Sequence, residues 1–367
     1  MNLTTTKEKI LSAAVIAERI VGKKESLPIL SCILLDTSNT LCIRSTNLEA
    51  GVDIVVIAEI KEKGVIAVPA TIFSQTIRSI NSDKVVLKTE SENLIVESRG
   101  ARTLIKAIPH EEFPILSWGD SGKNGSSIPK LTLIKGIQSV LYASSHSMIR
   151  PELGSIYVSI KSEQVTFAAT DSFRLAERTA KKGGSSSGEG EFLIPLKHAT
   201  ELVYVLERSP SENVKIHASD SQLVVVADST RFAARVVDGI FPNYAEIIPK
   251  QFTTEATILK NDFAEMLRKA RVFSGNDQHV GLHVYPKKKI FSATAQSPDV
   301  GETSDSIDAA VSGEDIDINF HIGYLADCVP AIDSDSITLG FSGPNRPLVI
   351  RGASDPGFTY LVMPLNR

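Results

Sequence analysis

The sequence predicts an α+β protein made of three copies of one domain, each with two helices packed on antiparallel sheets. Three observations support this prediction. A short threonine pattern occurs three times at one spacing, a polar turn between two β-rich runs recurs in each copy, and helical segments recur at matching places. A period this long indicates whole domains, because solenoid repeats usually run about 20–50 residues.

The threonine pattern reads IRSTN around Thr46, FAATD around Thr170 and FSATA around Thr294. Successive threonines are therefore 124 residues apart (170 − 46 and 294 − 170). A polar turn with Val- and Ile-rich runs on both sides predicts a pair of strands, and such segments occupy residues 85–107, 214–237 and 337–363. The same patterns in the same order indicate a true repeat.

Each copy is expected to begin with one amphipathic helix and to hold a second after its midpoint. The first helices are predicted at residues 7–20, 133–145 and 260–273, where apolar residues recur at i, i+4 and i+7 or close to it. The second helices are predicted at residues 69–80, 195–207 and 322–332. Pro69 and Pro195 are expected at the first helical position, which favours proline.

The expected domains are residues 1–122, 123–250 and 251–367. A Gly/Ser-rich stretch at 119–129 separates the first two, and residues 247–256 join the second to the third. Residues 181–190 are expected to form a flexible hairpin tip. They contain Gly184-Ser185-Ser186-Ser187-Gly188, a formal match to the G-x-S-x-G nucleophile motif. A Ser/Gly tract is not the strand–turn–helix that this motif requires.

Composition and charge narrow the class of protein. The net charge is -4 and the pI about 6.0, so any nucleic-acid contact must come from a local basic surface. Cys32, Cys42 and Cys328 lack metal or redox spacing, which favours plain thiols in a reducing compartment. Because we find no run of signal-peptide or membrane-span length, a cytoplasmic protein is expected.

The motifs favour neither catalysis nor a cofactor. The sequence has no Walker loop and no dinucleotide fingerprint. His279 and His283 have i, i+4 spacing, but on a strand-like stretch, so no metal is expected. Two alternatives stay open: an enzyme at a domain junction that uses an acid/base pair such as Asp171 and His146, and a monomeric peptide-binding scaffold.

Four segments resemble the bacterial DNA polymerase III beta subunit, the sliding clamp family. They are SLPIL from Ser26, TDSFRLA from Thr170, VVDGIFPNY from Val236 and VMPL from Val362. The resemblance implies a DNA clamp fold, in which a head-to-tail homodimer forms a ring of six domains around duplex DNA. Such a protein would be no enzyme but a processivity factor that tethers the replicative polymerase, the clamp loader and other replication and repair proteins.

The size of the helices supports a dimer. Twelve helices of about 10 Å width around a hole would leave an opening of ~28 Å, whereas the six helices of one chain would leave ~9 Å. The smaller opening is narrower than the major groove of DNA, which is about 12 Å wide. A chain of this kind must therefore pair with a second copy to encircle a duplex.

Cations facing the hole would attract phosphates without gripping bases, since strong base contacts would stop sliding. The candidates for DNA binding are Lys24, Arg78, Arg150, Lys197, Arg268 and Lys269. The acidic stretch 301–308 is expected to face outward and so leave the hole relatively positive.

The family also binds linear peptides with Gln and Leu or Phe anchors in a pocket between the second and third domains. The matching positions are Leu153, Thr170, Ser172, Arg174, Leu175, Pro242, Ile247, Tyr324, Met363, Pro364 and Leu365. Phe173, Glu246 and the Asn366-Arg367 end depart from the family pattern, which affects the peptide preference.

The resemblance places the dimer interface between the first domain of one chain and the third domain of the other. The positions implied are Thr103 and Ile105 on one side and Val272 and Phe273 on the other. Phe273 is the better apolar anchor, because aromatic residues are enriched in interface cores.

Overall fold

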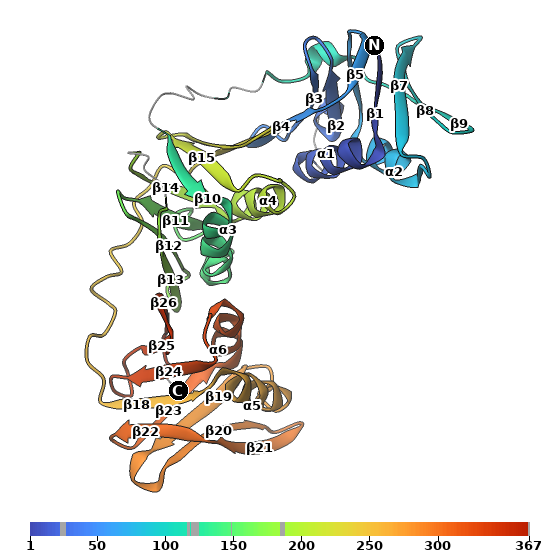
Figure 1. The fold of residues 1–367 in the computed structure, drawn as a ribbon. Helices are drawn as coiled ribbons and strands as arrows, with labels where there is room; N and C mark the ends of the chain where they lie inside the picture. The colour runs from blue at the N-terminus through green and yellow to red at the C-terminus, as the bar shows by residue number, and fades with distance from the viewer. Residues whose placement is uncertain (23–26, 116–117, 119–124, 148, 184–187, 366–367) are drawn as a thin grey trace. The chain divides into compact units, whose positions relative to one another are not determined.

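The computed structural model describes residues 1–367 except 23–26, 116–117, 119–124, 148, 184–187 and 366–367 (Figure 1). The chain divides into two compact units. Unit 1 consists of Met1–Ile134 and Gly183–Val236, and unit 2 of Lys135–Lys182 and Val237–Arg367. Helices pack on antiparallel sheets in both units, which confirms the predicted α+β class.

The helices form where the apolar periodicity predicts them, with shifted ends. They are α1 (Lys7–Ile20), α2 (Ala70–Ser79), α3 (Lys130–Gln138), α4 (Leu196–Glu207), α5 (Lys260–Val272) and α6 (Ile322–Cys328). Pro69 and Pro195 are N-caps, one residue before the position expected for them.

Two helices, α3 and α6, end four or more residues earlier than their sequence patterns predict. α3 ends at Gln138 because Val140 has φ -125° and ψ -22°, outside the helical region, and Leu141–Ala143 form a separate 3₁₀ turn. α6 ends at Cys328 because Pro330 has no N–H to continue the ladder, and Val329–Ala331 form a 3₁₀ turn.

The strands follow a similar order in each copy, with one strand fewer in the described part of the second copy. The first copy has β1 (Asn2–Thr6), β2 (Cys32–Asp36), β3 (Leu41–Thr46), β4 (Ala50–Val56), β5 (Glu59–Glu62), β6 (Val65–Pro69), β7 (Lys84–Glu90), β8 (Asn93–Ser98) and β9 (Ala101–Ile105). The second has β10 (Ser126–Pro129), β11 (Ser155–Ile160), β12 (Gln164–Thr170), β13 (Arg174–Lys181), β14 (Gly190–Pro195), β15 (Asn213–Ala218), β16 (Gln222–Ala227) and β17 (Thr230–Arg235). The third has β18 (Thr254–Leu259), β19 (His279–Tyr285), β20 (Ile290–Ser297), β21 (Gly301–Ile307), β22 (Ala309–Gly313), β23 (Ile316–His321), β24 (Ser336–Phe341), β25 (Leu348–Gly352) and β26 (Asp355–Val362).

In each unit, one sheet is continuous across two copies of the repeat. In unit 1, β17 of the second copy pairs antiparallel with β4 of the first, with Phe232 opposite Val52. This sheet has the order β10-β15-β16-β17-β4-β3-β2-β6, and a second sheet has the order β5-β1-β7-β8-β9. In unit 2, β13 of the second copy pairs with β26 of the third, with Leu175 opposite Leu361, within the run β11-β12-β13-β26-β25-β24-β18-β22. The third copy also holds a sheet of order β21-β20-β19-β23.

The repeated threonine forms the same turn in the first two copies. The Thr46 hydroxyl donates to the Ala50 carbonyl at 2.8 Å, and the Thr170 hydroxyl donates to the Arg174 carbonyl at 2.7 Å. Each threonine therefore closes the hairpin that follows its strand. In the third copy β20 runs past Thr294 to Ser297, and Thr294 bonds to a histidine instead.

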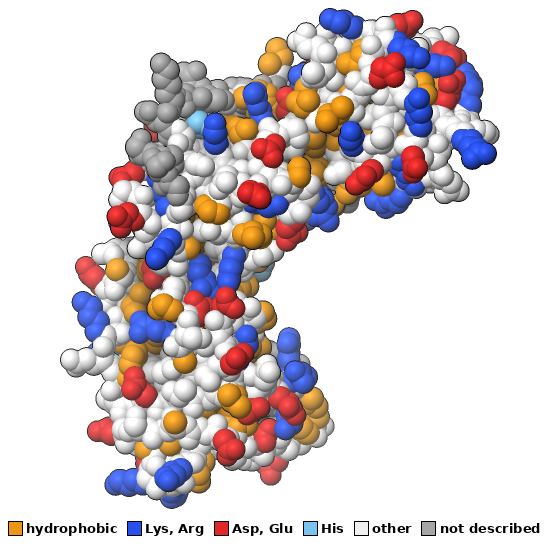
Figure 2. All heavy atoms as spheres, in the orientation of Figure 1, with side chains coloured by type: hydrophobic (Ala, Val, Ile, Leu, Met, Phe, Trp, Pro, Cys, Tyr) orange, Lys and Arg blue, Asp and Glu red, His pale blue; other side chains and the backbone are white. Residues whose placement is uncertain are grey.

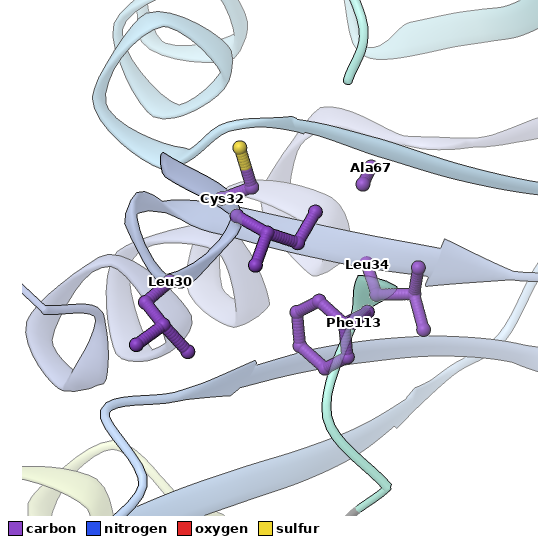
Figure 3. Packing of buried hydrophobic residues seen from close by; sticks show 6 residues of the cluster. Leu30, Cys32, Leu34, Ala67 and Phe113 are labelled. Atoms are coloured by element: carbon purple, nitrogen blue, oxygen red, sulfur yellow. The ribbon is translucent and has the colours of Figure 1, made fainter. Parts of the chain in front are cut away.

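The SLPIL motif contributes to the core of the first copy. Its Ser26 lies outside the described residues, while Ile29 and Leu30 are buried in a cluster with Cys32, Leu34, Ala67 and Phe113 (Figure 3). Cys32, Cys42 and Cys328 are free thiols, as expected. Within the described ranges, none of the helices combines the length and apolarity needed to cross a bilayer.

A buried ion pair links the second and third copies in unit 2. Arg178 on β13 pairs with Asp355 on β26 at 2.6 Å, and their side chains are only 7% and 9% exposed. The guanidinium also donates to the Ala331 carbonyl at 2.6 Å and lies over the Phe358 ring. A charge this enclosed depends on its partner, since a buried unpaired ion is costly.

Asp355→Ala should therefore lower the free energy of unfolding by about 3–5 kcal/mol, because it leaves Arg178 buried without its partner. Asp333→Ala is the matched control, since Asp333 pairs with Lys135 at a site where both side chains are more than half exposed. Its loss should stay below about 1 kcal/mol. Urea unfolding of the full chain measures both, and equal losses would contradict the prediction.

Candidate functional site

A pocket of about 710 Å³ lies within unit 2. Ligand sites typically have ~300–1,000 Å³, so a short peptide segment fits the space. Four segments line it: the β12–β13 turn, residues 246–251, the β24–β25 turn and the end of β26. Six of the residues predicted for the peptide pocket come together here, namely Thr170, Ser172, Arg174, Leu175, Ile247 and Met363.

The other predicted pocket residues lie outside the lining. Leu153 is buried, and Pro242 is exposed on the segment that leads to residue 246. Tyr324 on α6 lies against Arg174, and the Leu365 amide donates to the Asn319 carbonyl at 2.8 Å. Pro364, between Met363 and Leu365, is half-buried.

Apolar residues form the floor of the pocket. Leu175 and Leu361 lie opposite each other on β13 and β26 and form a buried cluster with Val349. Phe173 and Met363 flank this floor, and the Met363 amide donates to the Phe173 carbonyl at 2.8 Å. Phe173 is 60% exposed, so its ring adds apolar surface where a ligand can reach it.

Segment 246–251 is held in place by one of its own residues, Ile248, and by Tyr244 just before it. Tyr244 and Ile248 pack on the Leu175 cluster. The Tyr244 hydroxyl also donates to a Glu177 carboxylate oxygen at 2.5 Å, and its ring meets Phe241 edge-on at 5.8 Å. Phe241 stacks on Tyr157 at 5.1 Å. These aromatic contacts fix one wall of the pocket from behind.

Arg174 is the most constrained charge in the lining. Its guanidinium pairs with Asp171 at 2.9 Å and with Asp327 at 2.5 Å, and it lies 4.4 Å from the Tyr324 ring. Burial, and then the charge of Arg174, lowers the pKa of His321, so the imidazole is neutral near pH 7. His321 stacks on Tyr324 and caps α6 by accepting the Tyr324 amide. Tyr324 thus supports Arg174 rather than lining the pocket.

The structure does not favour the acid/base pair considered for an enzyme. Asp171 accepts hydrogen bonds from the Phe173 and Arg174 amides at 3.0 Å, so its carboxylate holds the turn. His146 lies exposed in the loop after Leu141–Ala143, and no hydrogen bond joins it to Asp171 among the described residues.

The histidines considered for a metal have other partners or none. His283 contacts Asp317 at 2.5 Å and Thr294 at 2.8 Å on the exposed side of β19, and His279 Nε2 is buried without a partner. Over the described ranges, no three His, Cys, Asp or Glu side chains are grouped so as to hold a metal ion.

The candidate DNA-binding cations lie mostly on helices. Arg78 is in the last turn of α2, Lys197 in the first turn of α4, and Arg268 on α5, whereas Arg150 lies in the loop before β11. Lys24 lies outside the described residues. Basic and acidic side chains are interspersed over the visible face (Figure 2), as the net charge of -4 leads one to expect.

Lys269 differs from the other cations because two carboxylates neutralise it. It contacts Asp305 at 3.1 Å and Glu265 at 3.4 Å, and the hydrogen bond that it donates to Asp305 raises the pKa of Lys269. Asp305 belongs to the acidic stretch 301–308, which was expected to lie apart from the helix cations. Its contact with Lys269 shows that the two are not fully segregated. Arg19 and Arg208, which both lie over the Tyr204 ring, are further helix-side cations that the sequence patterns did not single out.

The candidate interface residues lie at or beside two sheet edges. Thr103 and Ile105 belong to β9, the outer strand of the sheet β5-β1-β7-β8-β9. Thr103 is exposed, Ile105 is buried, and the neighbouring Leu104 is 50% exposed. Val272 and Phe273 end α5, and the Phe273 ring lies beside Gly301 at the start of β21, the outer strand of the sheet β21-β20-β19-β23.

Family models cover nearly the whole chain. The N-terminal, central and C-terminal domains of the DNA polymerase III beta subunit match residues 1–117, 127–243 and 245–366. The chain belongs to the DNA polymerase III beta subunit family. The family is a processivity factor without catalysis of its own, so the enzyme alternative is set aside. The exact boundaries 1–122, 123–250 and 251–367 stay predictions.

Known relatives agree over the full length. The beta sliding clamps of Bacillus subtilis and Escherichia coli K12 are each 25% identical to this chain, and both alignments cover 100% of the chain and of the relative. The beta subunit structure from Thermotoga maritima has a TM-score of 0.93 at 24% identity and covers 100% of this chain and 99% of that one. A sliding clamp from Pseudomonas aeruginosa bound to griselimycin has a TM-score of 0.93 at 22% identity and full coverage of both chains. These likenesses confirm the three-domain clamp fold.

The pocket wall gives a stability prediction. Tyr244→Phe removes the hydroxyl that donates to Glu177 and should cost about 1 kcal/mol of unfolding free energy. Tyr285→Phe is the control, because its hydroxyl donates to Asp317, whose side chain is 59% exposed, and should cost less. Chemical denaturation of the two variants compares them, and a larger loss for Tyr285→Phe would overturn the assignment.

Proposed function

We propose that two copies of this chain close head to tail into a ring around duplex DNA and hold partner proteins through the pocket of unit 2. The chain would thereby act as a sliding clamp that keeps a replicative polymerase on its template. The proposed partners of the pocket include a clamp loader and other replication or repair proteins that carry a suitable peptide. The proposed location is the cytoplasm.

The observation that carries the proposal is a pairing rule between copies. β9, β17 and β26 are the last strands of the three copies, and β4, β13 and β21 each follow the threonine strand. β17 pairs with β4, and β26 pairs with β13. Among the described strands, the same rule leaves β9 and β21 without the partner that it would give them, and each lies at the edge of its sheet.

A second copy satisfies the rule. Exposed strand edges are a liability that proteins usually block, and two different edges on one chain favour a heterologous, closing contact. β9 offers Leu104, which is 50% exposed, as an apolar contact for the partner edge. Thr103 and Ile105 on β9, with Val272 and Phe273 beside β21, remain the proposed interface.

The helix cations support a loose hold on DNA. We propose that the helix and loop cations attract phosphates through water, namely Arg78, Arg150, Lys197 and Arg268. Lys24 is included on the basis of the sequence alone. Lys269 should contribute less, because Asp305 and Glu265 compensate its charge. Attraction without base contacts leaves the ring free to slide.

The ring is tested by the mass of the protein in solution. The wild-type chain should scatter as a particle of about 79 kDa, twice the chain mass of 39.7 kDa, with the distance distribution of a hollow body. Leu104→Asp should halve the mass, because a buried unpaired carboxylate at the proposed interface is costly. Small-angle X-ray scattering over a concentration series measures both.

Ile57→Asp is the matched control for the ring test, since Ile57 is exposed in unit 1 but lies outside β9. It should keep the wild-type mass. A wild-type particle of 39.7 kDa at every concentration would leave the monomeric scaffold as the better reading.

The pocket is tested with a fluorescent peptide that carries Gln, Leu and Phe anchors. Met363→Ala should weaken its binding about fivefold, which corresponds to roughly 1 kcal/mol of lost apolar contact. Ile240→Ala is the control, because Ile240 is 90% exposed and outside the lining. Fluorescence anisotropy reports both affinities, and equal binding of the two variants would place the peptide elsewhere.

A further inference from the structure

We propose that the pocket of unit 2 selects, among peptides with apolar anchors, those that carry a carboxylate at the end that meets Lys250 and Arg346. The inference rests on the proposed function, since it assigns the chemistry of the ligand to the same pocket. It concerns two cations that the family motifs did not bring forward, each on a different wall segment.

Lys250 and Arg346 lie on neighbouring walls. Lys250 belongs to segment 246–251, and Arg346 belongs to the β24–β25 turn. The Ser342 hydroxyl donates to the Gln251 carbonyl at 3.0 Å and joins the two walls at this point. The Thr253 amide donates to the Phe341 carbonyl at 2.8 Å just behind it. The two cations therefore share one end of the pocket.

The turn that carries Arg346 has a defined shape. The Arg346 amide donates to the Gly343 carbonyl at 3.2 Å, which closes a four-residue turn with Pro344 at its second position. Proline there presets the backbone. Gly343 has φ +123°, a conformation that side-chain-bearing residues rarely adopt. Arg346 is thus presented from a fixed backbone, and a ligand need not order the loop on binding.

Both cations are available for a ligand. Lys250 and Arg346 are exposed, and neither forms an ion pair with any residue that the structure describes. Arg174, the third cation of the lining, is committed to Asp171 and Asp327. The positive charge that a ligand meets therefore comes from Lys250 and Arg346.

An acidic side chain, Glu246, also lines the pocket. It lies four residues before Lys250 and accepts a hydrogen bond from the Asn243 side-chain amide at 3.3 Å. Leu175, Leu361 and Met363 offer apolar surface for the anchors in the same pocket. A carboxylate is therefore favoured beside Lys250 and Arg346 and disfavoured beside Glu246.

The test compares the binding of three fluorescent peptides to the full chain by fluorescence anisotropy. Two have an amidated C-terminus and one has a free C-terminal carboxylate. The neutral probe is Gly-Gln-Leu-Ala-Leu-Phe amide, the second adds Asp after Phe and keeps the terminal amide, and the third is the neutral sequence with a free terminal carboxylate. At least one carboxylate probe should bind about three- to fivefold tighter than the neutral probe at low salt, the range of an exposed ion pair. Which of the two gains shows whether a side chain or the chain terminus supplies the carboxylate.

Variants assign the effect to the two cations. In the double variant Lys250→Ala/Arg346→Ala, the ratio of affinities for the carboxylate and neutral probes should fall to about one. Arg346→Glu should reverse the preference, toward a probe with Lys in place of the terminal Asp. Lys287→Ala, in the exposed β19–β20 connection, should keep the wild-type ratio.

The outcomes separate this inference from the proposed function. If the neutral probe binds but neither carboxylate probe gains affinity, or if the gain survives the double substitution, the charge selection is overturned and the peptide pocket stands. If no probe binds, and Met363→Ala changes nothing, the peptide-binding function itself fails.

Discussion

Antiparallel pairing between copies of the repeat is the constraint on which the rest of the structure depends. β13 and β26 join the second and third copies in one hydrogen-bonded ladder, and β17 and β4 join the first and second. Backbone ladders of this kind position two domains through many regularly spaced bonds rather than a few side-chain contacts. Each copy therefore pairs with its neighbour through one strand. The last strand of the first copy, β9, and the strand after Thr294 in the third copy, β21, have no such partner among the described strands.

The pocket is a product of the β13–β26 seam. Its floor is the pair Leu175 and Leu361, one from each copy, and its rigid charge is Arg174 at the first residue of β13. The same seam encloses the Arg178–Asp355 pair, which satisfies a charge that could not be buried alone. A site built on two paired strands keeps its shape because moving either strand would break the ladder.

Sequence patterns predicted the elements well and the boundaries less well. The helices followed the spacing of their apolar residues, but Pro69 and Pro195 proved to be caps, and Pro330 ended α6 early. The repeated threonines predicted equivalent places in three copies, although Thr294 lost the turn that Thr46 and Thr170 form. Local patterns report propensity, whereas the last turn of a helix and the length of a hairpin depend on what packs against them.

The sequence by itself determined the class, the threefold repeat and the family, because apolar periodicity and turn motifs are local and recur at one spacing. It also placed Thr170, Ser172, Arg174, Leu175, Ile247 and Met363 at the pocket through motifs. Only the tertiary structure brought Lys250 and Arg346 to neighbouring walls of one pocket, paired Lys269 with Asp305, and placed Tyr324 against Arg174. Each of these contacts joins residues that are far apart in the chain. A local sequence pattern cannot predict them, because the strands and loops involved meet only after folding.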